Sequence, residues 1–215
     1  MNAVIDTSAW PATKQKLVDA SVHLMRTTGF DATTLDDICE SAKVTKGALF
    51  HYFDSKNEVA MAALERFAEG KTAEFAGAPF RKLADPLQRV LGRLDFVIDS
   101  ASSTKVTRGC LIGMLAQEIS FREPELRKEC QELFSRVAED FRTDLAAAKA
   151  AYAAGAGFDP KNLATFYVSM IQGSLLVAKA SNSNRVLIEN VKQFRSMIEL
   201  LFANTSRKSA KSASE

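Results

Sequence analysis

Residues 29–58 read GFDATTLDDICESAKVTKGALFHYFDSKNE, and this stretch decides the fold. Thr34 occupies an N-cap position with Asp37 three residues later, the spacing of a capping box, and Ser55 with Glu58 repeats it. The pattern predicts helices over 35–42 and 45–52, joined by a tight turn, with a further helix starting near residue 56. The second helix presents small, basic, hydroxyl and aromatic groups near its N-terminus. Such a short exposed helix suits a DNA major groove better than a catalytic pocket.

The charge balance does not by itself announce a nucleic-acid-binding protein. The 215-residue chain has a formal net charge of only +2, and its first 60 residues hold six lysines and arginines against eight aspartates and glutamates. DNA affinity must therefore come from local placement of Lys43, Lys46 and Lys56, together with helix N-termini directed at phosphates.

The cysteines and the hydropathy of the chain indicate where in the cell the protein is expected. Cys39, Cys110 and Cys130 are too few and too scattered for a disulfide framework or a zinc site. The N-terminus lacks the pattern of a signal peptide, and no uninterrupted apolar run is long enough to span a bilayer. We expect a cytoplasmic protein with no metal, no cofactor and no membrane partner.

Helical periodicity runs through most of the chain, and strand signals are nearly absent. The fold class predicted is all-α, with an N-terminal three-helix domain and a larger C-terminal helical domain. The corresponding boundaries are 1–57 for the first domain, 58–204 for the second, and a disordered tail of small polar residues over 205–215. Outside the deciding stretch, the predicted helices cover residues 11–28, 56–76, 86–101, 107–121, 124–154, 160–181 and 184–204.

The chain resembles the TetR family of transcriptional repressors over about residues 13–60. The runs that carry the resemblance are GF, TTLDDI, KVTKGALFHYF and SKNE. The resemblance implies a homodimer in which a small helix-turn-helix domain reads DNA and a larger helical domain binds an inducer and dimerises.

The resemblance also implies which residues touch DNA. Thr34 and Thr45 would cap their helices and face phosphates, while Lys46 would reach a phosphate or a base edge. Gly47 would let the backbone approach DNA, and Phe50, where the family more often has Tyr, leaves only apolar contact. Phosphate contacts are expected for three further residues: His51, Tyr52 and Lys56.

On the effector side, residues 108–119, RGCLIGMLAQEI, and 173–181, GSLLVAKAS, resemble segments of one branch of the family. Some members of that branch sense electrophiles or reactive chlorine through a cysteine helped by a lysine, here Cys110 and Lys179. An ammonium group near a thiol lowers its pKa and speeds its reaction with electrophiles. The alternative is that Cys110 is a small buried hydrophobe. Cys130, on the apolar stripe of its helix, is interpreted as core.

Other apolar residues on the central helices are candidates for an inducer cavity, although such stripes are more often core. A mostly apolar lining would favour a small hydrophobic or aromatic inducer. The last two helices carry more apolar surface than one neighbour can cover, which predicts a four-helix dimer interface unless that surface packs internally. The cavity candidates are Phe96, Met114, Phe121, Phe134, Phe166 and Met170.

The sequence therefore predicts a ligand-responsive repressor that binds a palindromic DNA operator as a homodimer and is released by a small molecule. A repressor that senses oxidants or electrophiles through Cys110 is the first alternative. An enzyme of helical fold is the weaker one, because the two histidines, His23 and His51, both lie in the DNA-like region and no catalytic or metal-binding spacing occurs.

Overall fold

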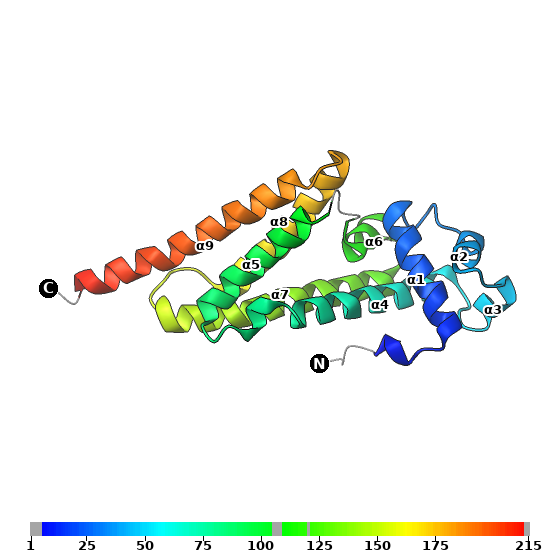
Figure 1. The fold of residues 1–215 in the computed structure, drawn as a ribbon, viewed down its shortest axis with the longest axis horizontal. Helices are drawn as coiled ribbons and strands as arrows, with labels where there is room; N and C mark the ends of the chain where they lie inside the picture. The colour runs from blue at the N-terminus through cyan, green and yellow to red at the C-terminus, as the bar shows by residue number, and fades with distance from the viewer. Residues whose placement is uncertain (1–5, 105–108, 120, 213–215) are drawn as a thin grey trace. The chain divides into compact units, whose positions relative to one another are not determined.

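The computed structural model describes residues 6–104, 109–119 and 121–212, with side chains through residue 203. Within these ranges the chain forms nine α-helices and two short 3-10 helices, and no strand (Figure 1). This confirms the all-α prediction. The chain divides into two compact units. The first unit comprises Met1–Ala76 and Arg108–Phe134, and the second comprises Gly77–Thr107 and Ser135–Glu215.

The first unit gathers the deciding stretch around a single apolar core. Its helices are α1 (Ala12–Thr27), α2 (Leu35–Ala42), α3 (Lys46–Phe50), α4 (Lys56–Ala76), α6 (Leu111–Ile119) and the first part of α7 (Pro124–Tyr152), with the 3-10 turn η1 (Thr7–Ala9) against α4. α1 packs on α2, α3, α4 and α6. Leu17, Ile38, Leu49, Leu64 and Leu115 are fully or almost fully buried together. The domain boundary predicted at residue 57 does not coincide with this unit, because α4 and α6 share the core of α1 to α3.

The second unit contains η2 (Pro79–Lys82), α5 (Pro86–Ser102), the remainder of α7, α8 (Pro160–Ala180) and α9 (Arg185–Ser212). α9 packs on both α5 and α8. Aspartate caps followed by proline fix the starts of two helices: Asp85 accepts from the Gln88 N–H at 2.7 Å, and Asp159 accepts from the Lys161 N–H at 3.0 Å.

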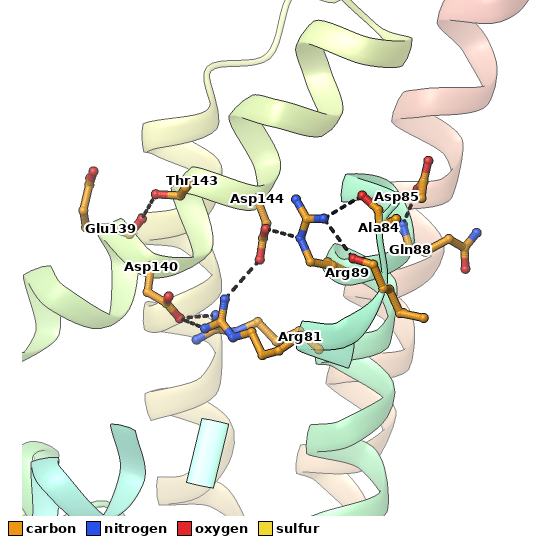
Figure 2. A network of polar contacts seen from close by, with 11 residues as sticks. Arg81, Ala84, Asp85, Gln88, Arg89, Glu139, Asp140, Thr143 and Asp144 are labelled. Carbon is orange, nitrogen blue, oxygen red and sulfur yellow. Dashed lines mark hydrogen bonds and ion pairs between the residues drawn. The ribbon is translucent and has the colours of Figure 1, made fainter. Parts of the chain in front are cut away.

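An ionic network inside the second unit joins η2 and α5 to α7 (Figure 2). Asp144, only 7% exposed, accepts from Arg89 Nε at 2.7 Å and from Arg81 Nη1 at 3.3 Å. Asp140 binds Arg81 and accepts from Arg93 Nη1 at 2.6 Å. Burial alone would raise the pKa of Asp140, but the hydrogen bonds and charges of Arg93 and Arg81 hold that pKa below its usual value.

Two helix ends differ from the sequence prediction. The segment predicted as helical from 107 begins only at Leu111, because Gly109 has φ +82° and cannot continue a right-handed helix; residues 107 and 108 lie outside the described residues. The helix predicted to end near 204 continues to Ser212. This segment contains no glycine or proline to stop the helix. Residues 213–215 lie outside the described residues.

Candidate nucleic-acid interface

The turn between α2 and α3 sets the direction in which α3 points. Lys43 ends α2 in the left-handed conformation, with φ +55°, and its N–H donates to the carbonyls of Cys39 and Glu40. Val44 N–H then donates to the Cys39 carbonyl at 3.0 Å. Because Ile38 of α2 and Leu49 of α3 are fully buried, the opposite side of α3 is left facing solvent.

The N-terminus of α3 is open. Thr45 Oγ1 accepts from the Ala48 N–H at 3.2 Å, which confirms the predicted cap. A Cβ placed on Gly47 would meet nothing within 4 Å, and Lys46 and Thr45 are exposed. The helix is shorter than predicted, with His51 as its C-cap. This arrangement leaves a hydroxyl, an ammonium and a bare backbone on one exposed helix end.

The aromatic residues that follow divide into two groups. Phe50 and His51 are exposed. Tyr52 is half-buried, packs against the core of the first unit, and stacks edge-to-face on His51 with ring centroids 4.8 Å apart. Tyr52 therefore holds α3 in place as well as presenting part of its ring to solvent.

Thr34 caps α2 as predicted. Its Oγ1 accepts from the Asp37 N–H at 3.1 Å, while Asp37 Oδ2 accepts from the Thr34 N–H at 2.9 Å. The side-chain and backbone hydrogen bonds from Thr34 hold the pKa of Asp37 below its usual value. Both residues are exposed, so the capped end of α2 is open to solvent like that of α3.

Lys56 is expected to contact a DNA phosphate, but its ammonium group makes contacts within its own unit. Its ammonium lies 4.3 Å from the centre of the Phe30 ring and donates to the Asp31 carbonyl at 3.2 Å. Partial burial holds the pKa of Lys56 below its usual value. The second predicted capping box is also incomplete: Ser55 Oγ accepts from the Glu58 N–H, but the Glu58 carboxylate accepts from the N–H of Asp54 instead of Ser55.

A set of polar contacts, missed by the sequence analysis, ties α6 and its flanks to the helix-turn-helix. Glu118 Oε2 accepts from the Asp31 N–H at 3.0 Å, and Arg122 Nη2 donates to Asp31 Oδ2 at 2.7 Å. Arg26 Nη2 donates to the Gly109 carbonyl at 2.9 Å. We call these three contacts the α6 latch. No sequence motif marks them, because they join residues more than eighty positions apart.

The latch makes Gly29 a sensitive position. Gly29 has φ +96°, and a Cβ there would lie 2.9 Å from a carboxylate oxygen of Glu118. Gly29→Ala should lower the free energy of unfolding by about 1–3 kcal/mol, since alanine is strained at this φ and would push Glu118 off Asp31. Thermal denaturation measures the loss. Gly70→Ala, a helical position with open space, is the control and should keep or raise stability; equal midpoints for the two variants would contradict this reading.

The predicted effector residues fall into both units. Cys110, Met114, Phe121 and Phe134 belong to the first, and Phe166, Met170 and Lys179 belong to the second. Phe121 is 97% exposed, which does not suit a residue lining a cavity within its unit. Cys110, Met114, Phe134 and Met170 are partly buried, whereas Phe166 and Lys179 are exposed.

Cys130 is 2% exposed, and burial raises the pKa of its thiol to about 11, so it stays protonated at neutral pH. An open depression on α7 contains none of the predicted effector residues; Ser135, Arg136, Glu139, Asp140 and Thr143 line it. Among the described residues, no three His, Cys, Asp or Glu side chains gather as a metal site would require.

These features define a helix-turn-helix protein with an exposed second helix. Residues 17–63 match the model of the bacterial regulatory proteins of the tetR family, and residues 86–193 match the C-terminal domain of LmrA/YxaF-like transcriptional regulators. The chain belongs to the TetR family of transcriptional regulators.

Individual proteins show the same likeness over more than four fifths of the chain. An uncharacterised HTH-type regulator of Lactococcus lactis is 26% identical over 87% of this chain and 93% of its own length. The HTH-type transcriptional repressor DhaR of a Mycobacterium species is 24% identical over 81% of this chain and 86% of its own. The crystal structure of a TetR regulatory protein from Rhodobacter sphaeroides has a TM-score of 0.78 at 22% identity, covering 86% of this chain and 98% of that one.

Proposed function

We propose that this chain is a ligand-responsive transcriptional repressor that binds a palindromic operator as a homodimer in the cytoplasm and is released by a small-molecule inducer. Residues 1–57 would read DNA, and residues 58–204 would bind the effector and dimerise. The observation that carries the proposal is the open, capped N-terminus of α3, with Lys46 and Gly47 exposed beside it. Repression is favoured by the name of the Mycobacterium relative, a transcriptional repressor.

The exposed groups suit a DNA groove. Phosphates are held by helix N-terminal amides, hydroxyls and side-chain N–H donors, which the capped ends at Thr34 and Thr45 and the ring of His51 supply. Lys46 can donate to base-edge acceptors such as guanine O6 and N7, and Phe50 can pack on a thymine methyl group. Tyr52 adds a hydroxyl for a phosphate from a ring fixed by the core. Lys56 would have to leave Asp31 to join them.

Dimerisation through α8 and α9 is supported by their exposed apolar residues. Phe166, Leu176 and Val177 on α8 and Leu200 on α9 are each about half exposed or more. By length and composition α8 could also cross a membrane, but the same is true of core helices in soluble proteins. Pairing with the same helices of a second copy covers this surface and gives the twofold symmetry that a palindromic operator requires.

Release by an effector would run through α4 and α6. Both helices pack in the core of the first unit, and the α6 latch ties α6 to the turn before α2. An inducer that binds better when α6 is displaced would shift the population toward heads that no longer fit successive major grooves. Within the first unit Met114 and Phe134 remain apolar candidates for its binding, and within the second unit Phe166 and Met170 do. Cys110 with Lys179 remains the candidate pair for a covalent version.

The direct test is selection of DNA from a random-sequence duplex library, followed by sequencing. The selected sites should contain an inverted repeat whose half-sites lie about one helical turn apart, because two symmetric heads reach successive major grooves. Absence of any enriched sequence, or enrichment of a single unrepeated site, would contradict the proposal.

A further inference from the structure

Asp36, on α2, is paired with the lysine that opens the recognition helix. Lys46 Nζ lies 2.7 Å from Asp36 Oδ1, and the two side chains remain 56% and 71% exposed. The hydrogen bond to Asp36 and the Asp36 charge hold the pKa of Lys46 above its usual value. The pair therefore joins α2 and α3 on the surface that the proposed function turns toward DNA.

The neighbouring acid, Asp37, has a different part in the structure. Its carboxylate accepts hydrogen bonds from Thr34 N–H and Oγ1, which completes the α2 cap. Asp36 takes no part in that cap; it lies in the first turn of α2, where its charge also suits the helix N-terminus, and its carboxylate is left to face Lys46. Its described ion pair is the one with Lys46.

An exposed pair of this kind contributes little to folding, so its larger consequence is for the electrostatics of DNA binding. A lysine that binds a phosphate displaces condensed counterions, and this term dominates binding to non-specific DNA. A lysine already neutralised at 2.7 Å gains less from a phosphate, and the adjacent carboxylate is itself repelled by the DNA backbone. At the operator, the major-groove edge of a guanine offers Lys46 two further acceptors, O6 and N7. Random DNA does not present these acceptors reliably at the position that Lys46 reaches.

We propose that Asp36 is a specificity-determining residue of the DNA interface; this inference rests on the proposed function. It neutralises Lys46 on random DNA and yields it at the operator, where base-edge acceptors compete with the carboxylate. Weak non-specific binding follows from this arrangement, and the acidic balance of the first 60 residues, eight acids against six bases, acts in the same direction.

The test is Asp36→Asn, measured by fluorescence anisotropy with a 30-base-pair random-sequence duplex and with the selected operator over a range of salt concentrations. The variant should bind the random duplex about 5–10-fold more tightly near 0.1 M salt, and its plot of log K against log salt should steepen by about one phosphate contact. Operator affinity should rise less, so that the ratio of specific to non-specific affinity falls.

Glu74→Gln is the matched control, because it frees Lys71 from a similar exposed pair with an N–O distance of 2.6 Å. Glu74 lies eighteen residues after Lys56 on α4, about 27 Å along the helix axis, so neither affinity should change. A second comparison places Asp36→Asn in a Lys46→Ala background, where the steeper salt dependence should disappear.

If the wild-type chain binds its operator while Asp36→Asn leaves the random-duplex affinity and the salt slope unchanged, the inference is wrong and the proposed function stands. The inference is also wrong if Asp36→Asn raises the random-duplex affinity and the salt slope equally in the Lys46→Ala background. The effect would then come from the change in net charge and not from the release of Lys46. A wild-type chain that binds no duplex at all would overturn the proposed function together with the inference. Circular dichroism and thermal midpoints should show that every variant is folded.

Discussion

Replacing Lys46 by alanine and Tyr52 by phenylalanine in one chain should weaken operator binding by at least about 30-fold. Lys46 opens the recognition helix and is exposed, and each specific contact of this kind is worth about 1–3 kcal/mol. Tyr52 is half-buried against the core, so phenylalanine removes the hydroxyl that would meet a phosphate while keeping the packing. Fluorescence anisotropy with the selected operator measures the change.

Lys128→Ala is the control for this double variant. Lys128 is 79% exposed on α7, in the same compact unit, and its ammonium lies 3.9 Å from a carboxylate oxygen of Glu132. The Lys128→Ala substitution removes one positive charge, as Lys46→Ala does, but does not change α3. It should leave operator affinity within a few-fold of that of the wild type. An operator affinity for the double variant equal to that of Lys128→Ala would show that α3 does not meet DNA.

Asp144→Asn should lower the free energy of unfolding by about 2–3 kcal/mol, the largest stability effect expected from a single isosteric change. Asp144 is 7% exposed and accepts from both Arg89 and Arg81, whereas an amide offers one acceptor and turns a donor toward a guanidinium (Figure 2). Removing one partner of a buried ion pair costs about 3–5 kcal/mol, and the partial exposure of both arginines reduces that figure. The thermal midpoint should fall by about 5–10 °C.

Glu139→Gln gives the comparison on the same helix. Glu139 pairs with Arg142 one turn away, and its side chain is well exposed, so its loss should leave the thermal midpoint close to that of the wild type. Guanidinium denaturation measures both variants. If their m-values equal that of the wild type, a shifted midpoint reports lost stability of the folded state and not a change in the unfolded state. A midpoint for Asp144→Asn within error of Glu139→Gln would mean that the network does not hold η2 and α5 to α7.

Helix starts were predictable because their causes are local. The pairs Asp85–Pro86 and Asp159–Pro160 fix a cap and a first turn within two residues, and Thr34 with Asp37 does so within four. The start of α3 at Lys46 followed in the same way from the cap at Thr45. The exposed part of the candidate site, Thr45 to His51, could therefore be placed from the sequence.

What the sequence did not predict depends on residues distant in the chain. Lys56 turns onto Phe30 and Asp31 because the turn after α1 brings them beside it, and no local pattern encodes that choice. The contacts of Glu118 and Arg122 with Asp31 depend on the packing of α6 and α7 in the first unit. The end of α9 was missed for another reason: a polar composition lowers burial but does not itself stop a helix.

Hydroxyl-radical footprinting of the selected operator, with the mass of the complex measured in parallel, tests most directly whether paired α3 helices occupy the grooves. Two copies of the chain should bind one duplex and protect two segments whose centres lie about ten base pairs apart on one face of the DNA. A single protected segment with one chain bound, or full protection by a chain carrying both Lys46→Ala and Tyr52→Phe, would contradict the account.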